Sequence, residues 1–197
     1  MHRVFISYNH QNDQIYKDAL VKWACENGVF IDGSVDTGDI SDDLPDQTIR
    51  KIIRDEYLRD TTVTILLCGT ETAKRKHVDW ELYSSMIDGA VNKKSGIIVI
   101  NLPSVNCTYY TANHAGEKEN VFPQTKKWTT LDRAGYESRY PYMPKRIIDN
   151  LANGALISVI NWTDVNSSKL KYMIERAYED RAICKYSFER DMMKRNL

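Results

Sequence analysis

The sequence lacks any excess of charge of one sign. Lysine and arginine together number 27, and aspartate and glutamate also number 27, so the formal net charge is zero. A protein without a net positive field has no long-range attraction for nucleic acid or for an anionic membrane surface. We therefore expect neither nucleic acid nor a membrane among the partners of this chain.

Long hydrophobic runs and paired cysteines are also absent from the sequence. No apolar stretch approaches the roughly 18–20 residues that a helix needs to span a bilayer. The first residues, Met1–Ile6, show no cleavable secretory pattern. The four cysteines lie far apart and form no Cys-x-x-Cys pair, which indicates reduced thiols and not a disulfide or zinc framework. These absences predict a cytoplasmic protein with no metal site.

The motifs of several common families are missing as well. No Gly-x-Gly-x-x-Gly follows the first predicted strand, and the chain contains neither a P-loop nor a Gly-x-Ser-x-Gly motif. The third predicted strand ends in Leu67-Cys68-Gly69-Thr70, without the aspartate that a response regulator would phosphorylate. Rossmann dinucleotide binding, P-loop phosphoryl transfer and serine hydrolase chemistry are therefore disfavoured.

What the chain does contain is a regular alternation of short apolar strands and amphipathic helices. Strands are predicted at Val4–Ser7, Val29–Ile31, Thr62–Cys68, Gly96–Asn101 and Ala155–Ile160. Helices are predicted up to about Asn27, from Pro45 through Tyr57, around Glu81 to about Gly89, and over about 167–184. Such an alternation is typical of a parallel sheet with right-handed crossovers. We expect a single α/β domain over residues 1–197, a flavodoxin-like three-layer sandwich with strand order 2-1-3-4-5 and helices on both faces.

One segment, Pro103–Pro144, interrupts this alternation. It has weak periodicity and many aromatic residues, and structureless insertions of this length are uncommon inside compact domains. Because it leaves from the carboxyl end of the fourth predicted strand, it could fold over a site there as a lid. The alternative is a packed surface excursion whose aromatic side chains cover the edge of the sheet.

Glu81 is the candidate catalytic residue. It lies in the first turns of the helix after the third predicted strand, at the carboxyl edge of the sheet where open α/β folds bind ligands. The loop Tyr8–Asp13 follows the first strand and should converge on the same edge. Three further polar residues share this side of the helix: His77, Ser84 and Asp88. A helix N-terminus favours an ionised carboxylate, so we expect Glu81 to be permanently anionic and to stabilise positive charge.

A fixed negative charge suits the cleavage of an N-glycosidic bond. The ribosyl carbon becomes oxocarbenium-like as the base departs, and a nearby carboxylate stabilises it. A leaving group that is already cationic, as nicotinamide is in NAD, needs no general acid. The alternative is that Glu81 is an ordinary solvated helix glutamate, as most glutamates at such positions are.

Three stretches together resemble a TIR domain. They are Val4-Phe5-Ile6-Ser7-Tyr8, the acidic loop Asp32–Asp43, and the Lys-His-Val-Asp-Trp-Glu-Leu stretch of Lys76–Leu82. More narrowly, the chain resembles the TIR-like proteins of bacterial Thoeris anti-phage defence, from Arg3 to about Trp162. The resemblance implies a flavodoxin-like fold and an enzyme that cleaves nicotinamide from NAD. It further implies that the remaining ADP-ribose is closed into a cyclic signalling nucleotide that activates a partner effector.

The resemblance also implies roles for individual residues. Glu81 falls at the catalytic glutamate position of the family. The implied substrate-binding positions are Ser7, Tyr8, Asn9, His10, Asp36, His77 and Trp80. His77 stands where many TIR domains carry a tryptophan, four residues before the glutamate, and Trp80 is the candidate to supply an aromatic surface instead.

The expected partners follow from the same resemblance. NAD is expected as a substrate and not as a bound cofactor, and the effector protein is reached through a diffusible nucleotide. A phage-derived trigger and a second copy of the chain are the other expected partners. Two alternatives stay open: a non-catalytic TIR-like interaction module, and a receptor that binds a nucleotide without turnover.

Overall fold

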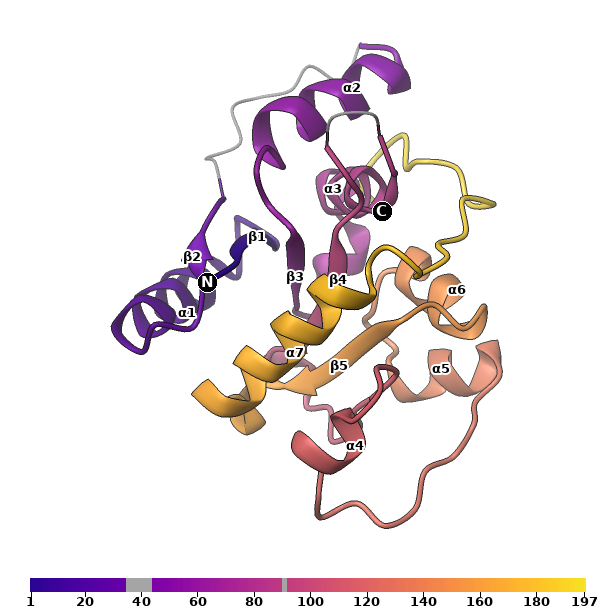
Figure 1. The fold of residues 1–197 in the computed structure, drawn as a ribbon. Helices are drawn as coiled ribbons and strands as arrows, with labels where there is room; N and C mark the ends of the chain where they lie inside the picture. The colour runs from indigo at the N-terminus through magenta and orange to yellow at the C-terminus, as the bar shows by residue number, and fades with distance from the viewer. Residues whose placement is uncertain (35–43, 90–91) are drawn as a thin grey trace.

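The fold is built on one five-stranded parallel sheet, seen in a computed structural model that describes residues 1–34, 44–89 and 92–197 (Figure 1). The strands are β1 (Arg3–Ser7), β2 (Ile31–Asp32), β3 (Val63–Cys68), β4 (Gly96–Asn101) and β5 (Ile157–Asn161). Their order is β2-β1-β3-β4-β5, and every neighbouring pair is parallel. The flavodoxin-like sheet predicted from the sequence is confirmed.

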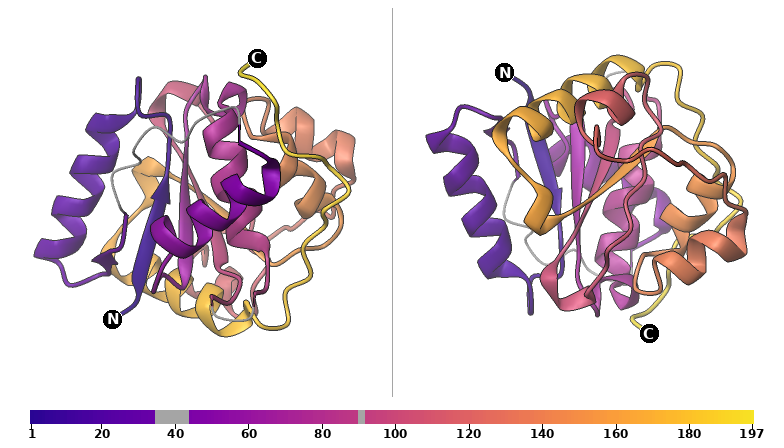
Figure 2. Two further views of the ribbon diagram at one scale, coloured as in Figure 1. Left: turned by 90° about the horizontal axis from the view of Figure 1, so that it is seen from above. Right: turned by 90° about the horizontal axis from the view of Figure 1, so that it is seen from below.

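Helices cover both faces of this sheet (Figure 2). One face packs against α1 (Gln14–Glu26) and α7 (Ser167–Asp180). The other packs against α2 (Asp46–Ile52), α3 (Lys76–Met86) and α6 (Lys145–Ala152). A π-helical turn, Ile53–Tyr57, continues α2, and two shorter helices lie between β4 and α6: α4 (Glu117–Asn120) and α5 (Arg133–Arg139). The three-layer arrangement is therefore confirmed.

Successive residues of the central strands belong to two different hydrophobic cores. In β3, Ile65 and Leu67 pack with the cluster beneath α1 and α7, whereas Leu66 and Cys68 pack with the cluster beneath α3 and α6. Every residue of β3 and β4 is buried. Covering on both faces explains why these strands are apolar without alternation. Each fully buried leucine or isoleucine contributes roughly 1.5–3 kcal/mol to this packing.

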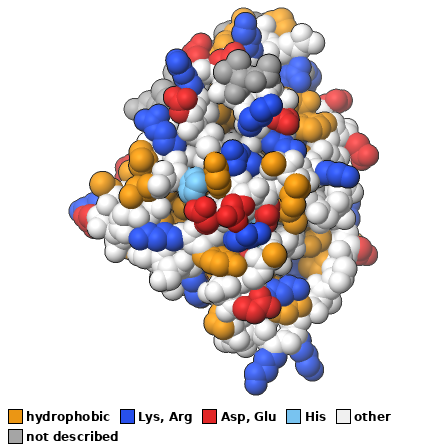
Figure 3. Space-filling view, viewed as in Figure 1, with side chains coloured by type: hydrophobic (Ala, Val, Ile, Leu, Met, Phe, Trp, Pro, Cys, Tyr) orange, Lys and Arg blue, Asp and Glu red, His pale blue; other side chains and the backbone are white. Residues whose placement is uncertain are grey.

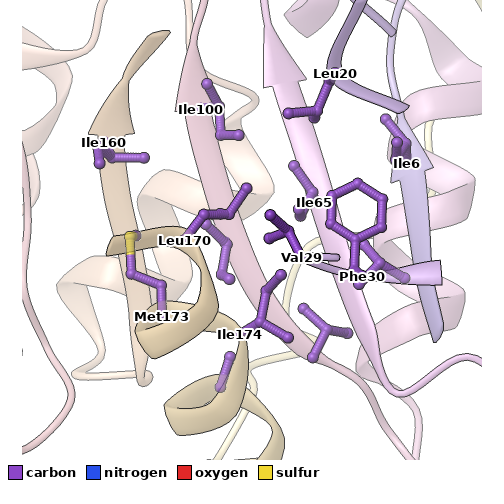
Figure 4. Close-up of a cluster of buried hydrophobic side chains, with 14 of the residues drawn as sticks. Ile6, Leu20, Val29, Phe30, Ile65, Ile100, Ile160, Leu170, Met173 and Ile174 are labelled. Atoms are coloured by element: carbon purple, nitrogen blue, oxygen red, sulfur yellow. The ribbon is translucent and has the colours of Figure 1, made fainter. Parts of the chain in front are cut away.

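The helix α7 lies close to the sheet at the start of β4. Its residues Leu170, Met173 and Ile174 point into the first core (Figure 4). A Cβ atom placed on Gly96, at the start of β4, would lie 2.1 Å from the carbonyl oxygen of Ala177. Glycine at position 96 therefore permits the close approach of α7 to β4.

Some boundaries differ from the sequence prediction. The second strand is Ile31–Asp32 and not Val29–Ile31, because the Val29 N–H still donates to the Ala24 carbonyl at the end of α1. The helix α3 ends at Met86, so Asp88 does not share its polar side. The helix α6 was not predicted from the sequence.

The segment Pro103–Pro144 lies along β5, the edge strand on the far side of the sheet from β2 (Figure 1). Thr111 forms an isolated antiparallel bridge with Val159, and the Ser158 hydroxyl donates to the Glu117 carboxyl at 2.6–2.7 Å. The segment thus covers the β5 edge of the sheet, and it also reaches the carboxyl end of β3, where the Cys68 thiol donates to the Tyr142 carbonyl at 3.5 Å.

The surface and the cysteines bear on partners and ligands. On the face seen in Figure 3, basic and acidic side chains are mixed, as the zero net charge leads one to expect.

None of the helices within residues 1–34, 44–89 and 92–197 is both long and apolar enough to cross a membrane. The four cysteines are free thiols. The same ranges contain no group of three histidine, cysteine or acidic side chains placed to hold a metal ion.

Candidate active site

The strand β1 and the helix α3 bring Ser7 and Glu81 into direct contact. Ser7 is the last residue of β1, and its hydroxyl donates a hydrogen bond of 2.7 Å to Oε2 of Glu81. Ser7 is fully buried and Glu81 is 3 % exposed. The predicted convergence of Glu81 with the end of the first strand is confirmed.

The ionisation of Glu81 differs from the prediction. Burial raises the pKa of Glu81 from its ordinary value of 4.5 to about 8, and the hydrogen bond from Ser7 opposes this rise only in part. The expectation of a permanently anionic carboxylate is wrong for the free protein, in which the group is largely neutral at pH 7. Glu81 is the sixth residue of α3, beyond the first turn where the helix dipole acts, so desolvation prevails.

Two buried polar groups near these residues lack a partner in the described part of the chain. They are the Asn9 amide nitrogen, Nδ2, and the Ser84 hydroxyl, Oγ. Each residue is 2 % exposed. Asn9 follows β1 by two residues, and Ser84 lies three residues after Glu81, on the same side of α3. Because buried polar groups are nearly always hydrogen-bonded in native proteins, both are candidates to bind polar atoms of a ligand.

The position of Ser84 on the helix could be predicted from the sequence, but its burial could not. Its spacing from Glu81 placed it on the polar side of the helix, but nothing in the sequence distinguished it from a solvated serine. Only its burial without a partner makes it a candidate ligand-binding group.

Tyr8 and His10 form an aromatic pair at the start of the loop after β1. Their rings stack with centroids 4.3 Å apart and planes 13° from parallel. The Tyr8 hydroxyl donates to Oε1 of Gln14 at 2.6 Å, which fixes the tyrosine against α1. Tyr8 is buried, whereas His10 is exposed. His10 therefore presents an imidazole ring to solvent next to the buried end of β1.

A second carboxyl group that the sequence did not single out, Asp13, lies between the ends of β1 and β3. It is 5 % exposed, and the Thr72 hydroxyl donates to Oδ2 at 3.4 Å. A Cβ atom on Gly69 would lie 2.7 Å from the same oxygen, so glycine is needed there. Burial raises the pKa of Asp13. Asp13 thus connects the loop after β1 to the loop after β3. In the sequence, only its position just before a helix distinguishes it from other aspartates.

Trp80 does not share the surroundings of the Glu81 carboxyl. It is 3 % exposed, packs with Phe5 and Met192, and its indole N–H donates to the Met193 carbonyl at 2.8 Å. Successive helical residues point about 100° apart, which directs Trp80 away from the side that Glu81 occupies. The structure therefore assigns Trp80 to packing against the C-terminal segment, contrary to the hypothesis that it offers a surface to substrate.

The remaining predicted residues are placed as follows. His77 is exposed in the first turn of α3, and its ring packs T-shaped against the ring of Trp80 with centroids 5.0 Å apart. Asp36 lies outside the residues that the structure describes. The structure thus groups Ser7, Tyr8, Asn9 and His10 at the end of β1, with Glu81 bonded to the first of them.

The raised pKa of Glu81 predicts a specific pH dependence of stability. Between about pH 4.5 and 8 the folded protein keeps a proton that the unfolded chain has lost, so the free energy of unfolding falls as pH rises. Between about pH 5.5 and 8.5, we expect the decrease in the free energy of unfolding to be smaller in Glu81→Gln than in the wild type, by on the order of 3 kcal/mol. Urea unfolding at about pH 5.5 and 8.5 measures it.

Other buried carboxyl groups do not disturb this comparison. Asp13 and Glu117 also have raised pKa values, but both are present in the wild type and in the variant, so their effects cancel. The variant Glu26→Gln, which removes an exposed carboxylate at the end of α1, serves as the control and should keep the wild-type pH dependence. An equal fall in all three proteins would show that Glu81 is ionised at neutral pH.

Comparison with known protein families adds one finding. Residues 5–107, more than half of the chain, match the family described as Thoeris protein ThsB, TIR-like domain. The matched range contains the last three residues of β1, the loop after it, and all of α3 with Glu81. A search of curated proteins gave no match.

Proposed function

Because the chain belongs to the Thoeris ThsB TIR-like family, we propose that this defence-related protein is an enzyme that consumes NAD. In this proposal it cleaves the bond between nicotinamide and ribose and closes the remaining ADP-ribose into a cyclic signalling nucleotide. That nucleotide activates an effector protein after a phage-derived trigger. The observation that supports the proposal best is the buried Glu81 carboxyl, hydrogen-bonded to Ser7 at the carboxyl end of β1.

The proposed reaction uses Glu81 in its ionised form. As the glycosidic bond breaks, its electron pair stays on the nicotinamide nitrogen, which leaves as a neutral ring, and positive charge develops on the ribosyl carbon. The Glu81 carboxylate stabilises this oxocarbenium-like state. Attack by an atom of the adenosine half closes the ring, whereas attack by water gives free ADP-ribose.

Burial of Glu81 has two consequences for this chemistry. A low-dielectric environment strengthens the attraction between the carboxylate and a positive ribosyl carbon. It also keeps the carboxyl neutral until a cation approaches, because desolvation penalises the charged form. The cationic nicotinamide ring of NAD is such a partner, so substrate binding itself favours ionisation of Glu81.

The pH dependence of turnover follows from this requirement. We expect kcat/KM for NAD to rise with pH and to level off above about 8, because this parameter reports the pKa of the essential group in the free enzyme. The variant Ser7→Ala loses the hydrogen bond that stabilises the ionised form, so its midpoint should lie at higher pH. A flat profile, or an unmoved midpoint in Ser7→Ala, contradicts the assigned role of the pair.

The proposal as a whole is tested by following the fate of NAD. Purified protein incubated with NAD should release nicotinamide and yield a new nucleotide that mass spectrometry detects. Cells that express the chain should be extracted after phage infection as well, because the trigger is absent from the purified system. If neither experiment shows nicotinamide release or a new nucleotide, the enzymatic proposal is wrong.

A second candidate function is a receptor that binds a nucleotide without turnover. The observations that favour it are the raised pKa of the buried Glu81 carboxyl and the Asn9 amide nitrogen, which is buried in the loop after β1 without a partner among the described residues. Such a receptor should show saturable binding of ADP-ribose and no loss of NAD over many hours.

A further inference from the structure

The segment Pro103–Pro144 encloses a cavity that the proposed function does not use. Its volume is about 480 Å³, within the range of about 300–1,000 Å³ typical of small-molecule sites. All of its lining residues lie between Thr108 and Arg139, next to β5 and so at the opposite edge of the sheet from β2. Neither Glu81 nor any residue of the loop after β1 contributes to the lining.

The charges around the cavity have one sign. Lys118, Lys127 and Arg139 contribute to the lining, and no carboxylate does. In a protein with equal numbers of basic and acidic residues, three cations without a carboxylate mark a local site for an anion. Arg139 can hold a phosphate or carboxylate with two hydrogen bonds, and the lysines add point charges.

Aromatic rings hold two of these cations in place. The Arg139 guanidinium lies over the ring of Tyr109 at 5.0 Å from the centroid, and the Lys118 ammonium lies over Trp128 at 5.2 Å. Cation–π contacts of this kind fix the cations without neutralising them. Tyr109 is 48 % exposed, so its ring is accessible to a flat ligand. The lining thus combines cations with aromatic surface on which a base can stack.

The walls of the cavity are anchored to the rest of the fold. The ring of Tyr110 stacks on that of Phe122 at 4.3 Å, 7° from parallel. The Thr111 N–H donates to the carbonyl of Val159 in β5, and the Thr111 carbonyl accepts from the Val159 N–H. The neighbouring helix α4 is held by Glu117, which accepts a hydrogen bond from Ser158 in β5. A preformed site of this kind binds a ligand at a low cost in ordering.

We propose that this cavity is a second ligand site, separate from Glu81, which binds a small anionic ligand with an aromatic ring, of the nucleotide class. The cations take its phosphate groups, and Tyr109 and Trp128 offer surfaces for its base. Ligand binding at this site does not require turnover of NAD. The proposal can therefore be correct or wrong whether or not the chain is an enzyme.

Photolabelling with 8-azido-ADP tests this site directly. The full chain is irradiated with the probe, and mass spectrometry identifies the labelled peptides. We expect label within residues 108–139, at least tenfold reduced by excess ADP and much less by adenosine, which lacks the phosphates. The double variant Lys127→Gln/Arg139→Gln should lose the label at least tenfold, while keeping the wild-type circular dichroism spectrum and thermal unfolding temperature.

A matched variant controls for the change in net charge. Lys22→Gln/Lys51→Gln removes two exposed cations of α1 and α2 and should keep the label. No label within residues 108–139, or label there that ADP or the pocket variant does not reduce, overturns the proposal. Label confined to residues 5–14 or 76–86 also overturns it, while supporting nucleotide binding beside Glu81.

Discussion

Replacing Glu81 by glutamine is expected to lower the rate of nicotinamide release from NAD by about a hundredfold to a thousandfold. The glutamine side chain has nearly the same shape, and its amide oxygen can still accept the hydrogen bond from Ser7. The variant therefore loses only the ability to become negatively charged beside the ribosyl carbon. Release of nicotinamide at saturating NAD, with the same trigger for both proteins, gives the ratio of rates.

Two controls make this result interpretable. Glu175→Gln makes the same chemical change on α7, where the carboxylate is exposed and bonded to His2, and should retain wild-type turnover. Thermal unfolding of both variants shows whether the fold is intact. If folded Glu81→Gln turns over NAD as fast as the wild type, Glu81 has no part in the reaction and the catalytic proposal fails.

Replacing Arg146 by methionine is expected to have the largest effect on stability, lowering the free energy of unfolding by about 3–5 kcal/mol. Arg146 is 1 % exposed and forms a bidentate ion pair with Asp79, with distances of 2.8 and 3.0 Å. It also donates to the carbonyls of Arg190 and Asp191, at 3.0 Å each. Removal of the guanidinium leaves Asp79 as an uncompensated buried charge. Urea unfolding at neutral pH measures the loss.

Arg133→Met is the matched control for this prediction. Arg133 also pairs with carboxylates, Glu137 and Asp149, but its side chain is 47 % exposed. An exposed ion pair of this kind typically contributes less than about 1 kcal/mol. The double variant Asp79→Leu/Arg146→Met should recover part of the loss, because it leaves no unpaired charge. A loss in Arg146→Met no larger than in Arg133→Met would contradict the prediction.

The Asp79–Arg146 pair also connects the C-terminal segment to the helix that carries Glu81. The Met193 N–H donates to Asp79 at 2.9 Å, and the Met193 carbonyl accepts from Trp80. Further along, the Lys76 N–H donates to the side chain of Asn196 at 3.0 Å. The last residues of the chain are therefore bound along α3. We expect the stability loss in Arg146→Met to be accompanied by faster amide exchange in residues 189–197.

Several features of the fold could be predicted from the sequence because they depend on local patterns. The unbroken apolar runs of β3 and β4 indicate strands covered on both faces, and the helices between them require parallel pairing. The order of strands then places the end of β1 next to β3, and so next to α3, the helix that follows β3 in the chain. This is why the proximity of Ser7 and Glu81 could be anticipated.

Other features escaped prediction because their cause lies in residues far apart in the chain. The apolar positions of α6, Ile147, Ile148 and Leu151, have helical spacing, but they follow a long segment without periodicity. The packing of Trp80 against the C-terminal segment could not be predicted, because its hydrogen-bond partner there lies more than a hundred positions away in the chain. The cavity lined by Lys118 and Arg139 exists only because the segment between β4 and α6 folds back along β5.

The sequence by itself determined the strand order, the family resemblance and the meeting of Glu81 with the end of β1, since periodicity and short motifs specify these. Only the tertiary structure decided the charge of Glu81, the role of Trp80 and the place of the C-terminal segment. The reason is that desolvation depends on every group packed around a side chain. The pKa of Glu81 therefore reflects its burial next to Ser7 of β1 and not its position on a helix.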